Sequence, residues 1–274
     1  QKGMETISHL SMIVHEQAAR YGSREALIFR SFGSLKWKSV SWKQFSLRVK
    51  QGSNAMLNIG LRPQDNIAVF AQNCIQYLYT DFGAYGIRVA SIPFYATSSE
   101  QQIQFMINDA QVRFLFVGEQ DQYDKAQKIF SLCPTLERII IFDPSVRMST
   151  HDPNSLYFED FIRLGENLPR QSEVEELYKQ ASDDDVCNIL YTSGTTGASK
   201  GVILTYGQYR AAHIANLKCV PVTDKDRVIT FLPLTHIFER GWCYLCLYAG
   251  SRIIINTYPR EIQQAMRETH PTCM

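Results

Sequence analysis

The sequence contains no uninterrupted apolar run of about 18 residues, which is the length that a membrane-spanning helix requires. It also lacks a secretory signal pattern ahead of its first periodic segment. Its seven cysteines are an odd number scattered through apolar stretches, which is typical of buried free thiols and not of a disulfide framework. We therefore expect a cytoplasmic protein without a transmembrane segment, in which peripheral contact with a membrane stays open.

The sequence also has almost no excess of positive over negative charge, since the formal net charge is only +1. Proteins that bind nucleic acid usually carry a basic patch, so we expect no nucleic-acid partner. The hydrophobic share of 45% and the charged share of 20% are those of an ordinary globular protein. A chain of 274 residues can bury a sizeable core in one large or two modest domains.

Short apolar segments alternate with amphipathic ones along most of the chain. After a helix at 6–21, strands at 25–30 and 35–40 and a helix at 41–59, we expect strands at 66–71, 89–94, 113–117 and 138–142, with helices at 74–87, 100–109 and 122–132 between them. Residues 143–154 are typical of a loop, and two helices are expected within 155–181. This alternation predicts parallel strands covered by helices.

A second alternating series follows. It predicts strands at 186–192, 227–232 and 252–256, helices at 208–217, 237–249 and 260–269, and a further strand after Pro271. The expected fold class is α/β, with two adjacent layers, largely parallel sheets and an incomplete second layer. The corresponding domains are residues 1–182 and residues 183–274.

The most informative segment is ILYTSGTTGASKGVILTY, at residues 189–206. A strand runs into a loop of small and hydroxylated residues, then a lysine, then a second strand at 201–204. Glycines let the backbone approach a ligand, while hydroxyls and a cation suit a polyphosphate. The simpler alternative is an exposed Gly/Ser/Thr hairpin loop. A Walker A loop does not fit, because Gly201 follows Lys200 and the next element is a strand, not a helix.

The motif YTSGTTGASKG resembles the phosphate-binding signature of the adenylate-forming superfamily, which contains acyl-CoA synthetases, luciferases and non-ribosomal peptide adenylation domains. The usual signature has proline where this chain has Ser199, a change that loosens the turn and removes no ligand group. The segment FLPLTHIFERGW at 231–242 and residues 92–118 resemble long-chain fatty acyl-CoA synthetases. The resemblance extends over nearly the whole chain from about Ile7.

This resemblance implies ATP, Mg²⁺ and coenzyme A as cofactor and co-substrates, with a fatty acid as substrate. The carboxylate would attack the α-phosphorus to give acyl-AMP and pyrophosphate, and coenzyme A would then displace AMP. The residues implied to surround the β- and γ-phosphates are Ser193, Gly194, Thr195, Thr196, Gly197 and Lys200. Thr192 would offer its hydroxyl to the magnesium ion, and His236 would act where the carboxylate meets the α-phosphate. Glu239 and Arg240 would line the nucleotide or acyl entrance.

Simpler roles compete with several of these assignments. His236 could cap a helix that begins near Ile237, and Glu239 and Arg240 could form surface ion pairs. An apolar helix carrying Trp242, Tyr244, Leu245 and Leu247 could wall an acyl tunnel or belong to the core. Cys243 and Cys246 have metal-ligand spacing but no second pair. The run Asp183, Asp184, Asp185 is typical of a solvated turn.

The resemblance also implies parts with no counterpart up to residue 274: the adenine-binding segment, a second magnesium ligand, the ribose-binding aspartate and a small C-terminal domain with a catalytic lysine. We expect the chain alone to be inactive and the missing C-terminal part to be its partner. Two other functions remain open, a ligase for a short-chain, aryl or amino acid and a non-catalytic nucleotide-binding module. Likeness of fold does not decide between them.

Overall fold

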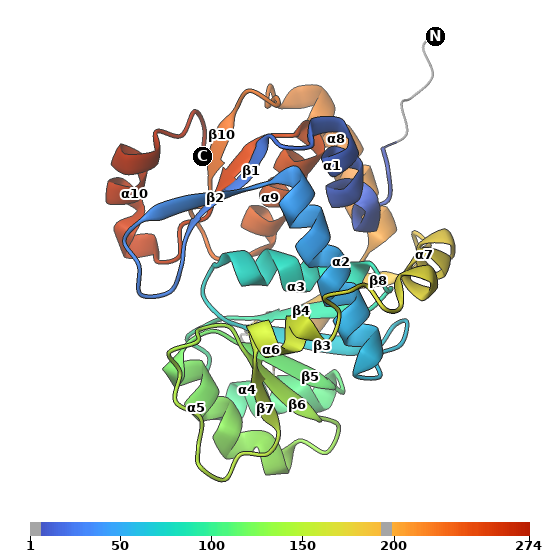
Figure 1. Ribbon diagram of the computed structural model, residues 1–274, viewed down its shortest axis with the longest axis vertical. Coiled ribbons are helices and arrows are strands. Elements are labelled where there is room, and N and C mark those ends of the chain that lie inside the picture. The colour runs from blue at the N-terminus through green and yellow to red at the C-terminus, as the bar shows by residue number, and fades with distance from the viewer. Residues whose placement is uncertain (1–6, 193–198) are drawn as a thin grey trace.

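The computed structural model describes residues 7–192 and 199–274. Two β-sheets lie one above the other, and helix α3 (Ile75–Tyr85) runs between them (Figure 1). This arrangement confirms the predicted pair of adjacent α/β layers. Among the described helices, none combines the length and apolar character needed to cross a membrane.

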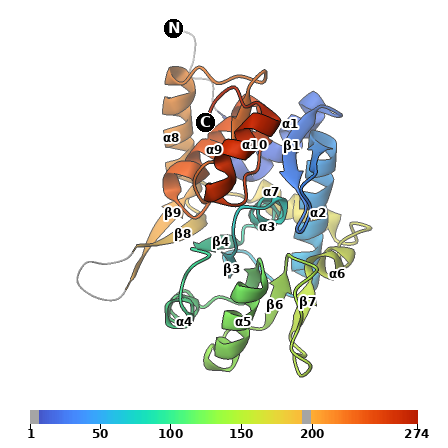
Figure 2. The same cartoon turned by 90° about the vertical axis from the view of Figure 1, so that its left-hand side faces the viewer.

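The larger sheet has the order β7-β6-β5-β3-β4-β8-β9. Neighbouring strands are parallel, apart from β8 and β9 at one edge, which form an antiparallel hairpin. The hairpin extends away from the body of the molecule in Figure 2. The strands of this sheet are β3 (Asn66–Phe70), β4 (Ala90–Phe94), β5 (Phe114–Val117), β6 (Arg138–Ile141), β7 (Ser155–Tyr157), β8 (Val186–Thr192) and β9 (Lys200–Thr205).

Side chains alternate across this sheet, and helices cover both faces. In β3, Ile67 and Val69 belong to the large core shared with α2 and α3, whereas Ala68 and Phe70 pack with α4 and α5. Burial on both faces of the sheet explains why the sequences of these strands are continuous apolar runs. The helices of this layer are α2 (Trp42–Asn58), α3, α4 (Glu100–Asp109), α5 (Gln120–Ile129), α6 (Phe158–Arg163) and α7 (Gln171–Lys179).

The smaller sheet has the order β10-β11-β1-β2. Its strands are β1 (Glu25–Arg30), β2 (Trp37–Ser41), β10 (Arg227–Ile229) and β11 (Arg252–Ile254). Leu27, Val228 and Ile253 join the large core, while Ile28, Ile229 and Ile254 pack against α10 on the opposite face. The associated helices are α1 (Ile13–Tyr21), α8 (Tyr206–Cys219), α9 (Ile237–Ala249) and α10 (Ile262–Thr269).

The two sheets do not divide along the chain at residue 183. Strands β8 and β9 complete the sheet built mainly from earlier residues, whereas β1 and β2 pair with β11 near the other end of the sequence. Each sheet therefore contains strands from both segments. The division into residues 1–182 and 183–274 stays a prediction about folding units.

Local signals placed most elements correctly. Ser41 caps α2 in a capping box with Gln44, and Gly60 follows the helix with a φ of +97°. The predicted strand after Pro271 is reduced to one parallel bridge between Cys273 and Val228. The prediction of helix at the start of 155–181 was wrong, because Ser155–Tyr157 form β7 alongside β6 before α6 begins.

Candidate active site

The β8–β9 hairpin carries the predicted phosphate-binding motif. Register pairs Tyr191 with Gly201 and Thr192 with Lys200. Directly paired residues of antiparallel strands have side chains on the same face, so Thr192 and Lys200 project from one face of the hairpin. Both residues are exposed. Since β8 and β9 are both strands, the structure confirms the strands predicted on either side of the motif, and a strand after the lysine separates this motif from a Walker A loop.

The predicted phosphate-binding residues Ser193, Gly194, Thr195, Thr196 and Gly197 lie outside the described residues. Gly201 is described, and packing within the hairpin explains the glycine at this position. A Cβ at this position would come within 2.8 Å of Ile189 Cγ2 on β8, and its φ is not among the positive values. The glycine therefore permits close packing across the hairpin, and is not needed here for an unusual backbone conformation.

The hairpin is tied to helix α4 close to Thr192. The hydroxyl of Tyr191, one residue before Thr192, donates a 2.6 Å hydrogen bond to the carboxylate of Asp109 at the end of α4. Burial, followed by this carboxylate, raises the pKa of Tyr191 well above its usual range, so the hydroxyl keeps its proton. The donated bond anchors the strand that leads into the loop.

His236 is the N-cap of α9, as the structural alternative predicted. Its Nδ1 accepts a hydrogen bond of 3.2 Å from the backbone N–H of Phe238. An accepting Nδ1 carries no proton, so the neutral ring holds its proton on Nε2. His236 is exposed, and its Nε2 makes no hydrogen bond to any described residue. The cap thus fixes an imidazole that can donate one hydrogen bond outward.

The turn before His236 is held by side chains from α3 and α9. Asn73, just before α3, donates to the carbonyl of Leu232 (3.0 Å) and accepts from the N–H of Leu234 (2.8 Å). Glu239 Oε2 accepts from the N–H of Leu232 at 3.1 Å. These contacts stabilise an irregular stretch of backbone, whose polar groups would otherwise be unpaired.

Glu239 and Arg240 do not form surface ion pairs, because they are 3% and 0% exposed. Arg240 Nη1 lies 2.7 Å from Asp81 Oδ2, and its Nε donates to the carbonyl of Leu234 at 2.8 Å. The guanidinium is thus enclosed and does not line an open entrance. Burial raises the pKa of Glu239, although the N–H groups of Leu232 and Phe231 oppose this shift.

Some apolar side chains of helix α9 lie in the core and others line a cavity. Tyr244 and Leu247 are fully buried, whereas Trp242 and Leu245 line a cavity of about 470 Å³ between α8 and α9. The other lining residues include Leu204, Gln208, Tyr209 and His213 from the hairpin end and α8, and Ile237, Phe238 and Gly241 from α9. The cavity therefore brings the end of β9 and the first turn of α9 to one apolar space.

Two further sequence patterns are structural. Cys243 and Cys246 are buried, burial raises their thiol pKa values, and the described residues contain no cluster of three or more metal-ligating side chains. In the acidic run, Asp185 binds Arg88 through both oxygens and Asp183 pairs with Arg210. Asp185 is buried, so the predicted solvated turn describes only part of this run.

Comparison with known proteins assigns this arrangement to a family. Residues 14–274 match the model of the AMP-binding enzymes. The chain belongs to this family. It is 31% identical over 240 residues to fatty acyl-CoA synthetase A of Dictyostelium discoideum, covering 85% of this chain and 34% of that protein. It is 29% identical over 239 residues to the human long-chain-fatty-acid–CoA ligase ACSBG2, covering 86% and 35%. The chain spans about a third of the length of these relatives.

Solved structures of the family share the fold. The anthranilate CoA ligase AuaEII, in complex with anthranoyl-AMP, matches 97% of this chain and 49% of its own with a TM-score of 0.83 at 18% identity. A long-chain-fatty-acid-CoA ligase (FadD1) from Archaeoglobus fulgidus matches 98% of this chain and 51% of its own with a TM-score of 0.75, also at 18% identity. These matches confirm the predicted α/β fold class.

Proposed function

We propose that this chain is the N-terminal part of an AMP-forming ligase that joins a long-chain fatty acid to coenzyme A. The β8–β9 hairpin carries the proposal, because Lys200 and Thr192 face each other where the strands enter the glycine- and hydroxyl-rich loop. The family match and relatives named as long-chain fatty acid ligases support the reaction class. The one-third coverage of those relatives supports a longer protein.

The hairpin would bind the β- and γ-phosphates of ATP. In this proposal Lys200 contributes a positive charge, and Ser193, Gly194, Thr195, Thr196 and Gly197 contribute hydroxyl and backbone donors. The exposed hydroxyl of Thr192 fits a magnesium ion that takes its other oxygen ligands from phosphates and water. Such an ion would neutralise phosphate charge. The role of Lys200 is to stabilise the pyrophosphate as it leaves.

His236 would orient the reacting oxygens. The capping bond at Nδ1 leaves the Nε2 proton available for an oxygen of the fatty acid carboxylate or the α-phosphate. Attack by the carboxylate forms the bond between its oxygen and the α-phosphorus and breaks the bond to pyrophosphate. In the second step the thiol of coenzyme A forms a thioester, and AMP leaves with the former carboxylate oxygen. Arg240 would act only by holding the backbone of the turn.

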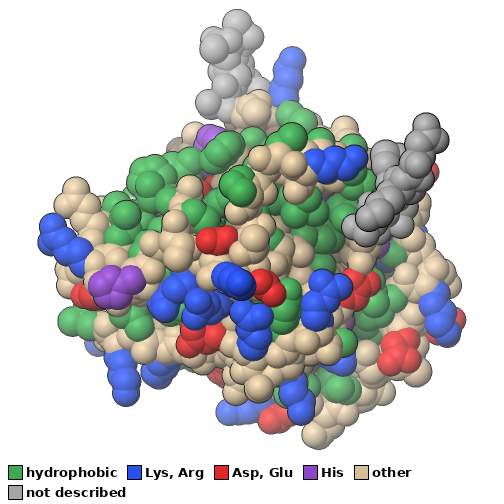
Figure 3. Space-filling model, turned by 90° about the horizontal axis from the view of Figure 1, so that it is seen from above, with side chains coloured by type: hydrophobic (Ala, Val, Ile, Leu, Met, Phe, Trp, Pro, Cys, Tyr) green, Lys and Arg blue, Asp and Glu red, His purple; other side chains and the backbone are tan. Residues whose placement is uncertain are grey.

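The cavity between α8 and α9 would receive the acyl chain. Its lining is predominantly apolar and includes Trp242, Leu245 and Phe238, the last of which lies two residues after His236. Apolar surface of this kind favours binding of hydrocarbon over polar acids. The face shown in Figure 3 also carries a broad area of hydrophobic side chains in its upper part. Peripheral contact with a membrane that supplies the acid belongs to the same proposal, as does a reducing, cytoplasmic location for the free cysteines.

The test is an assay of the longer protein with Mg-ATP, coenzyme A and carboxylates from acetate to palmitate, measuring AMP and ADP separately. We expect AMP only with long acids, and a loss on the order of a hundredfold or more in Lys200→Ala. The matched control Lys218→Ala removes another exposed lysine, on α8, and should leave activity unchanged.

Each other outcome has a defined meaning. AMP formation with a different acid would support the proposed reaction and overturn the proposed long-chain substrate. Equal loss in both lysine variants would overturn the role of the hairpin. If no acid supports nucleotide turnover, the ligase proposal is overturned in favour of a non-catalytic nucleotide-binding module.

A further inference from the structure

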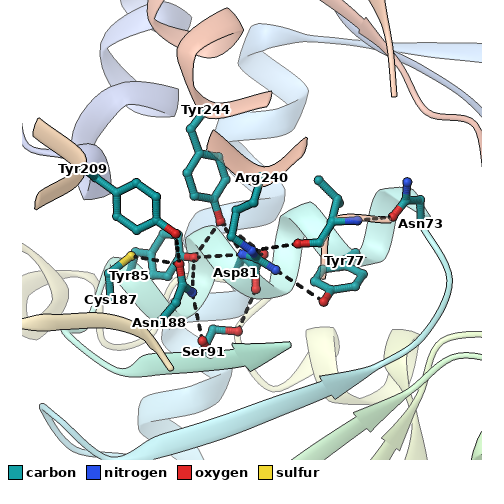
Figure 4. A network of polar contacts seen from close by, with 11 residues as sticks. Asn73, Tyr77, Asp81, Tyr85, Ser91, Cys187, Asn188, Tyr209, Arg240 and Tyr244 are labelled. Carbon is teal, nitrogen blue, oxygen red and sulfur yellow. Dashed lines mark hydrogen bonds and ion pairs between the residues drawn. The ribbon is translucent and has the colours of Figure 1, made fainter. Parts of the chain in front are cut away.

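A buried polar network lies between the two sheets, where α3 meets α9 and β8 (Figure 4). At its centre the hydroxyl of Tyr85 contacts Tyr244 OH at 2.6 Å, Asn188 Nδ2 at 2.9 Å and Arg240 Nη1 at 3.3 Å. All four side chains are at most 1% exposed. Hydrogen bonds of this kind are strong, since water does not compete for the partners.

One half of the network ends at the turn that precedes His236. Arg240 donates from Nε to the carbonyl of Leu234, two residues before His236, at 2.8 Å. Its Nη1 pairs with Asp81 Oδ2 at 2.7 Å and contacts Tyr244 OH at 2.6 Å. The position of this turn is therefore tied to α3, which carries Asp81 and Tyr85.

The other half ends on strand β8. Asn188 Nδ2 donates to Tyr85 OH and, at 2.8 Å, to the carbonyl of Ser91 on β4, while Asn188 Oδ1 accepts from Tyr209 OH at 2.7 Å. Asn188 lies four residues before Thr192 on the same strand. A strand transmits position over that distance, because its backbone pairs with β9 from Asn188 to Thr192 and with β4 at Asn188.

We propose that Tyr85 is a positioning residue that couples the His236 turn to the strand leading into the phosphate-binding loop. Its hydroxyl is the direct link between the Arg240 half of the network and the Asn188 half, and a phenylalanine would remove it. A longer route remains, because Ser91 donates from its hydroxyl to Asp81 at 2.7 Å and accepts from Asn188 at its carbonyl. This inference rests on the proposed function for its catalytic consequence, while the coupling itself is a property of the chain. The groups held by the His236 turn and by the phosphate-binding loop must meet within a few tenths of an ångström, so their two supporting segments need a rigid connection.

The chain supplies a matched control for a purely structural role. Tyr77 lies on the same helix, is 0% exposed, and accepts a hydrogen bond of 3.3 Å from Arg240 Nη2. Its hydroxyl has no contact with Asn188 among the described hydrogen bonds. Tyr77→Phe and Tyr85→Phe thus each remove one buried hydroxyl beside the same guanidinium, and only the second removes the direct link to β8.

The first measurement is amide hydrogen exchange on the 274-residue chain, which needs no activity. We expect Tyr85→Phe to accelerate exchange about tenfold in both 186–192 and 231–236, and Tyr77→Phe to leave 186–192 unchanged. Tyr209→Phe, which removes only the donor to Asn188 Oδ1, is a milder second variant and should accelerate exchange in 186–192. Equal effects of Tyr77→Phe and Tyr85→Phe on 186–192, or no effect of Tyr85→Phe or Tyr209→Phe there, would overturn the coupling.

The second measurement is the rate of AMP formation by the longer protein. With coupling lost, kcat should fall on the order of tenfold in Tyr85→Phe while the KM values for ATP and acid stay near those of the wild type, because the contacts that bind each substrate remain. A fall of the same size in Tyr77→Phe would overturn the positioning role. If the wild type forms no AMP, the proposed function fails, and the exchange comparison still decides the coupling.

Discussion

Arg240 and Asp81 form an ion pair of 2.7 Å although they lie on different helices, 159 residues apart, and are both essentially inaccessible to water. The guanidinium also contacts three tyrosine hydroxyls and one backbone carbonyl. Burial of two charges costs several kcal/mol per ion, so the pair is stable only because these neutral partners complete its hydrogen bonding. Removal of one partner has a predictable effect.

Asp81→Asn should lower the free energy of unfolding by about 3–5 kcal/mol, because the guanidinium stays buried without a counter-ion. Urea unfolding followed by circular dichroism measures this change. The control Asp160→Asn breaks an exposed pair with Arg163 and should cost less than about 1 kcal/mol. Replacing both partners, as Asp81→Leu with Arg240→Met, should recover much of the loss. A double variant less stable than Asp81→Asn would contradict this account.

Gly241 offers a test of the cavity as an acyl site. A Cβ built at this helical position meets nothing within 4 Å, and the residue lines the cavity between α8 and α9. Gly241→Ala should raise the free energy of unfolding by up to about 1 kcal/mol, since alanine is the better helix former. Gly241→Leu should occupy cavity space and shift AMP formation towards shorter acids, measured over a series of chain lengths.

Gly165 is the contrasting position for this experiment. A Cβ there would overlap the backbone of Gln51, so Gly165→Ala should destabilise the protein. If Gly241→Leu binds long acids as the wild type does while remaining folded, the acyl chain does not occupy this cavity.

Two histidines, the buried His213 and the half-buried His15, should make stability depend on pH. Burial lowers the pKa of His15 and of His213 to about 4. The unfolded chain therefore binds protons near pH 6.5 that the folded chain does not bind until about pH 4, so stability is lost as the pH falls through this interval. Each histidine contributes at most about 1.4 kcal/mol per pH unit. Above pH 7 this contribution is constant.

His213→Gln should reduce the dependence by about that amount, since glutamine can still donate to the carbonyl of Gly241, which His213 Nε2 contacts at 3.3 Å. Urea midpoints at pH 5, 6 and 7 measure the slope. The control His151→Gln removes an exposed histidine and should leave the slope as it is. An unchanged slope in His213→Gln would show that folding does not lower the pKa of this ring.

The sequence predicted elements well where the signal was local. The helices Glu100–Asp109 and Ile237–Ala249 and the strand Val186–Thr192 have the predicted bounds, because caps and apolar periodicity are properties of neighbouring residues. Strand β7 was missed because it has three half-buried residues and no apolar run. The motif around Lys200 predicted a strand on each side of its glycine-rich part, and β8 and β9 confirm both strands.

Long-range pairing could not be predicted in this way. Nothing near Arg240 in the sequence indicates that Asp81 compensates its charge, so a buried arginine was interpreted as an entrance or surface residue. For the same reason the sequence did not single out Tyr85, Asn188 or Asn73 as site residues. Asn188 bonds to Ser91, 97 residues away, and to Tyr209, 21 residues away. Asn73 bonds to Leu234, 161 residues away. A buried polar side chain on an otherwise apolar element was the signal present, as in the Asn188 of β8.

The place of β1 in the smaller sheet has a consequence for synthesis of the chain on the ribosome. Leu27 pairs with Ile253, so the strand that completes this part of the sheet is translated long after β1 itself. At about 5–20 residues per second, the delay is roughly ten to forty seconds. During that time β1 pairs only with β2, and Ile28 lacks Ile229, Ile254 and Ala265, which pack against it in the folded protein. The nascent chain therefore exposes apolar side chains of the β1–β2 hairpin. A chaperone that shields residues 25–41 would increase the yield of folded protein.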